Sequence, residues 1–208
     1  MLREIAGPVG RLEALLDEPA AGVPVRAAVI FGHPHPQHGG TMHTKVVYQA
    51  AKALRRIGCG VLRFNFRGAG TSMGTFSDGP GEMDDLRAGL DYLSDRYPSV
   101  PIWAGGMSFG SWIAMTVGAE DPRVSTLIGI SMPVTRYDWE VVRRSPKPKF
   151  FIHGERDEFC SLKDIREFYA RAEEPKELVV IDAADHLFDG KVGEVAEAIE
   201  DLLQDWDE

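Results

Sequence analysis

The sequence has few cysteines and no signal-peptide pattern. Its 208 residues include only two cysteines, Cys59 and Cys160, which lie far apart and form neither a zinc pair nor a redox Cys-x-x-Cys motif. Disulfide bonds are therefore not expected, and this cysteine usage fits a reducing compartment. The N-terminal residues lack the apolar core and the cleavage pattern of a signal peptide, so we expect a cytoplasmic protein.

The sequence also has no excess of basic residues and no uninterrupted apolar run. Lys and Arg number 23 against 32 Asp and Glu, a formal net charge of −9, and no basic stretch is interleaved with aromatics. Nucleic acid is therefore not an expected partner. The one long uncharged stretch, 97–119, is broken by prolines and glycines, so we expect no membrane span and no membrane partner. The oligomeric state stays open.

The remaining composition, 44% hydrophobic and 26% charged residues, is that of a globular protein. The length favours a single domain over residues 1–208. Short apolar runs alternate with segments of helical periodicity, which predicts an α/β protein with a mostly parallel, doubly wound sheet and helices on both faces. An antiparallel edge strand is expected at Gly10–Leu16. The other expected strands are Val25–Phe31, Val61–Phe66, Ile102–Gly105, Thr126–Ile130, Phe150–His153 and Leu178–Ile181.

Four helices are expected where apolar side chains recur every three or four residues. The first covers Val46–Ile57, and Gly58 follows where a helix C-cap would place it. The second covers Met83–Tyr97. The third begins after Ser161, which with Asp164 resembles a capping box. The fourth covers 192–203.

The pattern Gly-x-Ser-x-Gly is typical of a nucleophile elbow, in which a serine lies on a sharp turn from a strand into a helix. The pattern occurs twice. Ser72 is followed by turn residues, so no helix begins directly after it. Ser108 follows the apolar strand Ile102–Gly105 and precedes a segment with the character of a buried helix. We therefore predict that Ser108 is the nucleophile, the alternative being that its glycines only let strand and helix pack closely.

A serine hydroxyl is a poor nucleophile unless a base lies within hydrogen-bond reach. His186 follows the last expected strand, in a loop at the carboxyl end of the sheet, and is the predicted base. The alternative for His186 is an exposed loop histidine. His153 is the rival, but it ends the preceding strand, where a half-buried, hydrogen-bonded structural histidine is the more usual case.

The predicted acid that orients the base is Asp157, in the loop directly after the strand Phe150–His153. A turn or cap aspartate is the alternative function of this residue. Asp138, after the preceding strand, is the second candidate. Asp185 is too close in sequence to His186 to be its default partner.

Five segments together resemble the α/β-hydrolase superfamily over nearly the whole chain, and within it the small, lidless dienelactone-hydrolase-like and short-chain esterase branch. They are Gly32–Gly40, Asn65–Gly68, the elbow at Ser108, Gly154–Asp157 and Asp185–His186. The resemblance implies an α/β-hydrolase fold without a lid domain, and the chain order Ser108, Asp157, His186 is the order of a triad in that fold. Dienelactone hydrolases are expected to use a cysteine at the elbow, so Ser108 favours ester chemistry.

In this fold the loop after the first parallel strand supplies one arm of the oxyanion hole. The two prolines in that loop have no N–H to donate, which leaves His33, His35 and Gln37. We predict His35, with Gln37 as the alternative. The second donor is expected to be the backbone N–H of Phe109, at the start of a helix whose dipole favours an anion.

Two further groups of residues invite a binding role. Arg67 is a candidate for binding a substrate carboxylate, and an ion pair with Glu82 or another acidic residue is the alternative. Four histidines have a spacing that permits metal ligation, namely His33, His35, His38 and His43. Because interleaved prolines stiffen this loop and no carboxylate or cysteine joins the cluster, we predict no metal site, while incidental metal binding stays open.

These residues predict a serine hydrolase that cleaves small carboxylic esters through an acyl-enzyme. No cofactor is implied, and the expected partner is a small-molecule ester. Since the chain has little material for a lid, short acyl groups are expected to be preferred over long lipids. Thioesterases, lactonases and amidases use the same machinery, and a non-catalytic binding protein with the same fold is the alternative from another class.

Overall fold

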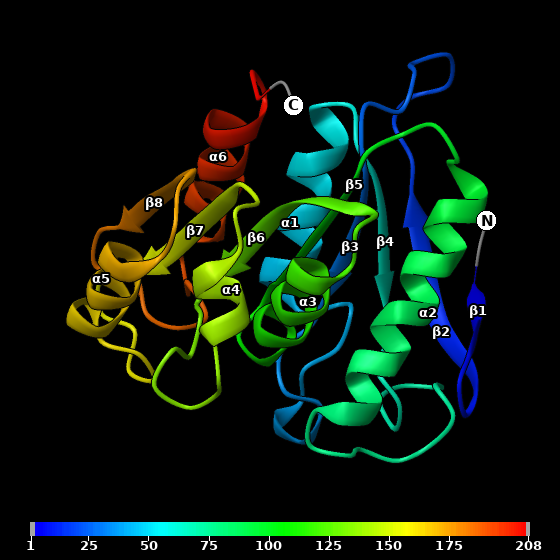
Figure 1. Cartoon of the computed structure of the whole chain (residues 1–208), viewed down its shortest axis with the longest axis horizontal. Helices are drawn as coiled ribbons and strands as arrows, with labels where there is room; N and C mark the ends of the chain where they lie inside the picture. Colours follow the sequence, from blue (N-terminus) through cyan, green and yellow to red (C-terminus); the bar gives the residue numbers. More distant parts are fainter. Residues whose placement is uncertain (1–2, 207–208) are drawn as a thin grey trace.

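The computed structural model describes residues 3–206, which form one eight-stranded sheet with helices on both faces (Figure 1). The strand order is β1-β2-β4-β3-β5-β6-β7-β8; β1 and β2 run antiparallel to their neighbours and the other six strands are parallel. The strands are β1 (Glu4–Gly7), β2 (Gly10–Asp17), β3 (Ala28–Gly32), β4 (Gly60–Phe64), β5 (Ile102–Met107), β6 (Val124–Ile130), β7 (Lys149–Gly154) and β8 (Lys176–Ile181).

The helices form a layer on each side of the sheet. They are α1 (Lys45–Arg56), α2 (Pro80–Arg96), α3 (Phe109–Glu120), α4 (Glu140–Arg144), α5 (Leu162–Arg171) and α6 (Val192–Leu203), with a short 3-10 turn at Pro36–His38. The helices α1 and α6 pack together against one face, and the other four cover the opposite face. Among residues 3–206 no helix is both long and apolar enough to cross a membrane.

The central parallel strands β3, β5 and β7 are mostly apolar because both of their faces are buried. In β7, the side chain of Phe150 packs on the α6 side of the sheet, against Trp206. The next side chain, Phe151, points to the opposite side and contacts Phe168 and Tyr169 of α5. The α/β architecture expected from the alternating sequence pattern is therefore confirmed.

The expected helix ends are also confirmed in two places. Helix α1 ends at Arg56, and Gly58 follows with φ 92°, the left-handed conformation that favours glycine at a helix C-terminus. The side chain of Ser161 accepts a hydrogen bond from the backbone N–H of Asp164 and so caps α5.

The antiparallel edge was predicted only in part. The expected strand at Gly10–Leu16 is present as β2, but β2 lies between β1 and β4, so β1 is the true edge. The strand β1 was not predicted, because its four residues bury only Ile5 and give no clear alternating pattern. The predicted strand Val61–Phe66 runs too far, since the Phe66 N–H donates to the imidazole of His33 instead of to a neighbouring strand.

The sheet register brings the ends of three strands together. Gly32 at the end of β3 lies opposite Gly106 of β5, and Met107 of β5 lies opposite Ile130 at the end of β6. The loops that follow β3, β5 and β6 therefore meet at one edge, outside the carboxyl ends of parallel strands, where open α/β sheets bind their ligands.

Candidate active site

Ser108 lies on the sharp turn that joins β5 to α3. Its backbone has φ 53° and ψ −123°, a left-handed conformation that is strained for a residue other than glycine. The turn is held from outside, because the N–H of Ser108 donates to the carbonyl of Ile130 in β6 at 2.9 Å. The Ser108 side chain is half-buried and lines a cavity. Of the two Gly-x-Ser-x-Gly patterns, this one has the strand, turn and helix that the elbow requires.

The two glycines around Ser108 let α3 lie directly against the sheet. A Cβ at Gly106 would overlap the carbonyl of Gly110, and a Cβ at Gly110 would overlap the backbone of Gly32 and His33. Strand β3 and helix α3 thus touch backbone to backbone behind the serine. Close packing was the alternative interpretation of this motif, and the structure shows that it accompanies the elbow.

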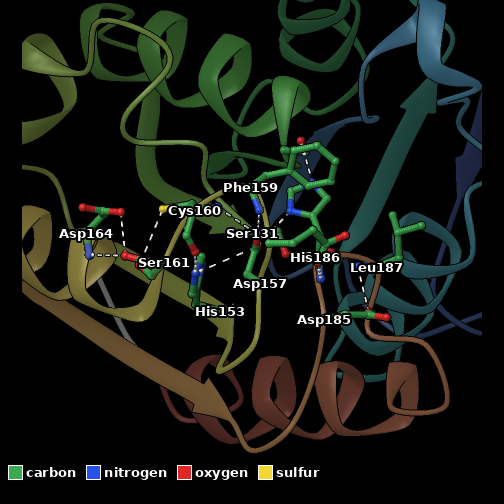
Figure 2. A network of polar contacts seen from close by, with 12 residues as sticks. Ser131, His153, Asp157, Phe159, Cys160, Ser161, Asp164, Asp185, His186 and Leu187 are labelled. Carbon is green, nitrogen blue, oxygen red and sulfur yellow. Dashed lines mark hydrogen bonds and ion pairs between the residues drawn. The ribbon is translucent and has the colours of Figure 1, made fainter.

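His186 lies in the loop after β8 and its imidazole is directed at Ser108. The Nε2 atom is 2.9 Å from the Ser108 Oγ. Two contacts hold the backbone of His186. Its N–H donates to the carboxylate of Glu158 at 3.1 Å. Its carbonyl accepts from the hydroxyl of Ser131 at 2.9 Å (Figure 2). The ring of Phe159 packs edge-on against the imidazole, and the His186 side chain is 7% exposed. His186 is thus not an exposed loop histidine.

Asp157 lies on the far side of the imidazole from Ser108. Its Oδ2 atom is 2.8 Å from the His186 Nδ1, and its Oδ1 accepts the backbone N–H groups of Phe159 and Cys160 (Figure 2). Burial raises the pKa of this carboxyl, but the hydrogen bond and positive charge of His186 outweigh burial and leave the pKa below its usual value. An ionised Asp157 accepts a hydrogen bond from Nδ1–H, which leaves the Nε2 lone pair facing the Ser108 hydroxyl.

His153, the rival base, is buried beneath this loop. Its Nε2 is 2.8 Å from the carbonyl of Cys160, and because a carbonyl only accepts, Nε2 carries the proton (Figure 2). Burial lowers the pKa of His153, so the neutral ring is favoured. His153 is the hydrogen-bonded structural histidine that the sequence favoured, although it is fully buried instead of half-buried.

The loop after β3 is fixed by His33. The His33 Nε2 accepts the Phe66 N–H at 3.0 Å, so the proton resides on Nδ1, which donates to the carbonyl of Pro34 at 2.6 Å. Burial lowers the pKa of His33 to about 4. Since C=O and N–H point in opposite directions across a trans peptide, this bond holds the His35 N–H on the side away from His33.

The two predicted oxyanion donors border the cavity beside Ser108. Neither the His35 N–H nor the Phe109 N–H has an acceptor among residues 3–206. The alternative donor, Gln37, does not line the cavity. The cavity has a volume of about 220 Å³ and is lined by Pro34, His35, His38, Ser108, Phe109, Pro133, Arg136, Tyr137, Phe159, His186 and Leu187.

Arg67 is used differently from the substrate-binding role considered above. Its guanidinium forms a two-pronged ion pair with the buried carboxylate of Asp85 in α2, with Nη2 to Oδ1 at 2.7 Å, and it does not line the cavity. The alternative of an ion pair is therefore the correct one. Glu82 is not the partner, because its carboxylate accepts from Ser77 and Gly79 at the start of α2.

The other sequence candidates have structural contacts of their own. The Ser72 hydroxyl is buried, donates to the carbonyl of Asn65 and accepts the N–H of Glu13. The exposed carboxylate of Asp138 accepts the N–H of Glu140 at the start of α4. Asp185 likewise caps the backbone N–H groups that follow it.

The cavity wall that follows β6 was not predicted from the sequence. Pro133, Arg136 and Tyr137 line the cavity from the segment between β6 and α4. The ring of Tyr137 stacks on Trp112 of α3, with centroids 4.1 Å apart. The sequence did contain a signal for this wall, because these residues directly follow the carboxyl end of a central strand.

The histidine cluster has no ligand geometry for a metal. The rings of His35 and His38 stack face to face with centroids 4.4 Å apart, while His33 is directed into the core. Within the described part of the chain, no three His, Cys, Asp or Glu side chains gather in a way that would hold a metal ion.

Comparison with known proteins places the chain among hydrolases. Residues 25–147 match the family described as "Serine aminopeptidase, S33" (Hydrolase_4). The "Uncharacterized protein RP471" of Rickettsia prowazekii (strain Madrid E) is 37% identical over 206 residues, which are 95% of this chain and 86% of that protein.

Two solved structures are similar over nearly their full length, each with a TM-score of 0.91. One is an alpha-beta serine hydrolase homologue from Coxiella burnetii, 36% identical, with 96% of this chain and 95% of that chain covered. The other is XC6422 from Xanthomonas campestris, described as a member of the a/b serine hydrolases without lid, 34% identical, with 98% and 93% covered.

Proposed function

Because this chain belongs to the serine aminopeptidase S33 family of α/β-hydrolases, we propose that it is a serine hydrolase that cleaves small carboxylic esters. The α/β-hydrolase fold itself agrees with the expectation from the sequence. The observation that carries the proposal is the continuous chain of contacts from Ser108 through His186 to Asp157, at 2.9 Å and 2.8 Å. These are hydrogen-bond distances in the order that nucleophilic catalysis needs.

In the proposed reaction, the Ser108 Oγ attacks the carbonyl carbon of the ester while the His186 Nε2 takes the hydroxyl proton. Asp157 accepts from Nδ1–H and stabilises the imidazolium that forms. The N–H groups of His35 and Phe109 bind the oxyanion of the tetrahedral intermediate, where the start of α3 adds its dipole. The imidazolium gives its proton to the leaving alkoxide, and the alcohol departs.

The second half of the reaction releases the acid. Water attacks the acyl carbon, and the His186 Nε2 takes a proton from this water. Collapse of the second tetrahedral intermediate breaks the bond to the Ser108 Oγ, which recovers a proton from the imidazolium. The carboxylic acid leaves, and the enzyme returns to its starting state without any cofactor.

The lining of the cavity supports an ester over a peptide with a free amino terminus. Recognition of an α-ammonium group calls for an acidic side chain, and no Asp or Glu lines the cavity. The lining instead carries the guanidinium of Arg136. We therefore expect aminoacyl anilides to be poor substrates compared with neutral phenyl esters.

A fluorophosphonate probe tests the proposal directly. The probe forms a stable adduct only with an activated serine, and peptide mass spectrometry locates the adduct. We expect labelling of Ser108 and its loss in Ser108→Ala. An adduct on Ser72 would contradict the assignment of the nucleophile, and the absence of any adduct together with the absence of ester hydrolysis would leave a non-catalytic binding protein.

Acyl-chain length provides a second test. The cavity of about 220 Å³ is smaller than the roughly 300–1,000 Å³ typical of ligand pockets. In a series of para-nitrophenyl esters, kcat/KM should therefore be highest for short acyl groups and fall toward palmitoyl. A steady rise toward palmitoyl would contradict the proposed substrate size.

A further inference from the structure

The cavity beside Ser108 combines aromatic walls with positive charge. Its aromatic lining includes Phe109, Tyr137 and Phe159, and Phe159 is 60% exposed at the rim. The polar side chains of the lining are those of Ser108, Arg136 and Tyr137 and three histidines, and none of the lining residues is acidic. In a chain with a formal net charge of −9, a cavity lining that contains no Asp or Glu favours an anionic ligand.

Arg136 carries the permanent positive charge in the cavity lining. It lies in the segment between β6 and α4, with its guanidinium 5.9 Å from the ring centroid of Tyr137. Within residues 3–206 no carboxylate oxygen lies within ion-pair distance of this guanidinium. The neighbouring helix α4 shows the contrast, because Arg143 and Arg144 both pair with Glu140. Of these three arginines, only Arg136, which lines the cavity, has no acidic partner among the described residues.

The positive charge of Arg136 also acts on the cavity wall. Burial is the main cause that lowers the pKa of His35; the positive charges of His38 and Arg136 lower it further, whereas the carboxylates of Asp78 and Glu82 act in the opposite direction. A neutral His35 adds no positive charge of its own, so the guanidinium of Arg136 is the permanent positive charge of the lining and the group that would pair with a bound anion. Arginine suits this task because its planar fork binds a carboxylate through two parallel hydrogen bonds.

We propose that the substrate is a small ester that is apolar beside its scissile bond and carries a carboxylate, which Arg136 binds at the cavity rim. The inference rests on the proposed function and adds a substrate class to it. Aromatic side chains would contact the apolar part of the ester, and the guanidinium would fix the end that bears the charge. Arg136 is then a specificity-determining residue that does not touch the reacting atoms.

Matched pairs of esters that differ only in charge test this assignment. On the leaving-group side, the pair is para-acetoxybenzoate and para-acetoxybenzamide; on the acyl side, it is monophenyl glutarate and its terminal amide. For the wild-type protein, we expect kcat/KM to favour the anionic member of at least one pair. In Arg136→Gln this preference should fall on the order of tenfold, chiefly through KM, and Arg136→Lys should restore part of it.

The control is Arg166→Gln, which removes one positive charge from an exposed position on α5 that does not line the cavity. The preference should not change in this variant. A preference that is the same within twofold for the wild-type protein and Arg136→Gln in both pairs would overturn the proposal. Because the preference is a ratio, a general loss of activity in one variant does not affect it.

A binding measurement separates failure of this inference from failure of the proposed function. The esters bind without turnover to Ser108→Ala, with or without Arg136→Gln, and calorimetry gives the Kd for each. If the wild-type protein hydrolyses neither pair, the proposed function is wrong, and tighter binding of the anionic ester that depends on Arg136 would still support the subsite. Equal binding of both members of each pair would overturn the subsite.

Discussion

The polar side chains of the site are held in place by hydrogen bonds to the atoms that do not face the reacting group. Asp157 accepts two backbone N–H groups with one oxygen and faces His186 with the other. His33 is fixed in one tautomer because the Phe66 N–H occupies its Nε2. Such outer contacts set where each proton resides, and proton position decides whether an imidazole can act as a base.

Asp157→Asn tests this arrangement at a single residue. The amide can donate to Nδ1, which favours the tautomer with the proton on Nε2, where it can no longer accept the Ser108 proton. We expect kcat for a short ester to fall about 10³- to 10⁴-fold. The matched control is Asp138→Asn, at the second candidate acid, which should stay within a few-fold of the wild-type value. A loss of activity in Asp138→Asn but not in Asp157→Asn would exchange the two assignments.

The sequence predicted the positions of the site residues better than their contacts. Ser108, Asp157 and His186 were chosen because each follows a strand at its carboxyl end, and the structure brings these three together. The contact between Ser131 and His186 was not predictable, because it joins residues 55 positions apart across two loops. Several acidic residues near Arg67 in the sequence were possible ion-pair partners. The packing of α2 brings Asp85 within ion-pair distance of the guanidinium.

At the scale of elements, the site depends on how closely α3 approaches β3. The helix begins at Phe109, directly after the strained turn, and Gly110 faces the backbone of Gly32. Glycine is the only residue that permits this contact without a shift of the helix. The N–H of Phe109 belongs to the same first turn, so a shift of α3 would displace the proposed oxyanion donor as well.

Gly110→Ala should therefore destabilise the fold and slow the reaction together. Overpacking at a buried contact costs about 1–3 kcal/mol, which urea denaturation would measure, and displacement of Phe109 should lower kcat. The matched control is Gly193→Ala in α6, where the added methyl group meets open space and should leave stability within about 1 kcal/mol. Equal stability of the two variants would contradict the close-packing argument.

The errors in the predicted strand boundaries arise because pairing with neighbouring strands decides where a strand begins. The predicted strand Val25–Phe31 begins three residues early, because β3 first pairs with both neighbours at Ala28. The apolar residues near the start of this segment do not reveal where the partner strands begin. The strand β1 was not predicted for a related reason. Its sequence pattern is too short to indicate a strand, and β1 forms because it pairs with β2.

At the scale of the whole molecule, folding buries two histidines whose neutral form is favoured, His33 and His153. His33 has a folded pKa of about 4, and burial also lowers the pKa of His153. In the unfolded chain a histidine has a pKa of about 6.5, so between these values the unfolded state binds more protons. The free energy of unfolding must therefore decrease as the pH falls from about 6.5 toward 4.

For His33 alone, this linkage amounts to about 3 kcal/mol between pH 7 and pH 4. The depressed pKa of Asp157 acts in a lower window, because its contribution is lost only as the pH falls below the usual aspartate range. Denaturation at pH 7, 6 and 5 measures the slope, and His33→Asn should flatten it. A constant free energy of unfolding from pH 7 to pH 5 would contradict a neutral, buried His33.

The position of His186 after β8 has a consequence for the synthesis of the protein. The last strand in the chain pairs only with β7 among the described strands, and the loop behind it reaches back 78 positions to Ser108. A ribosome therefore completes the elbow well before it has made the proposed base. If His186 is the base, we expect Ser108 to become reactive only after the final strand has docked.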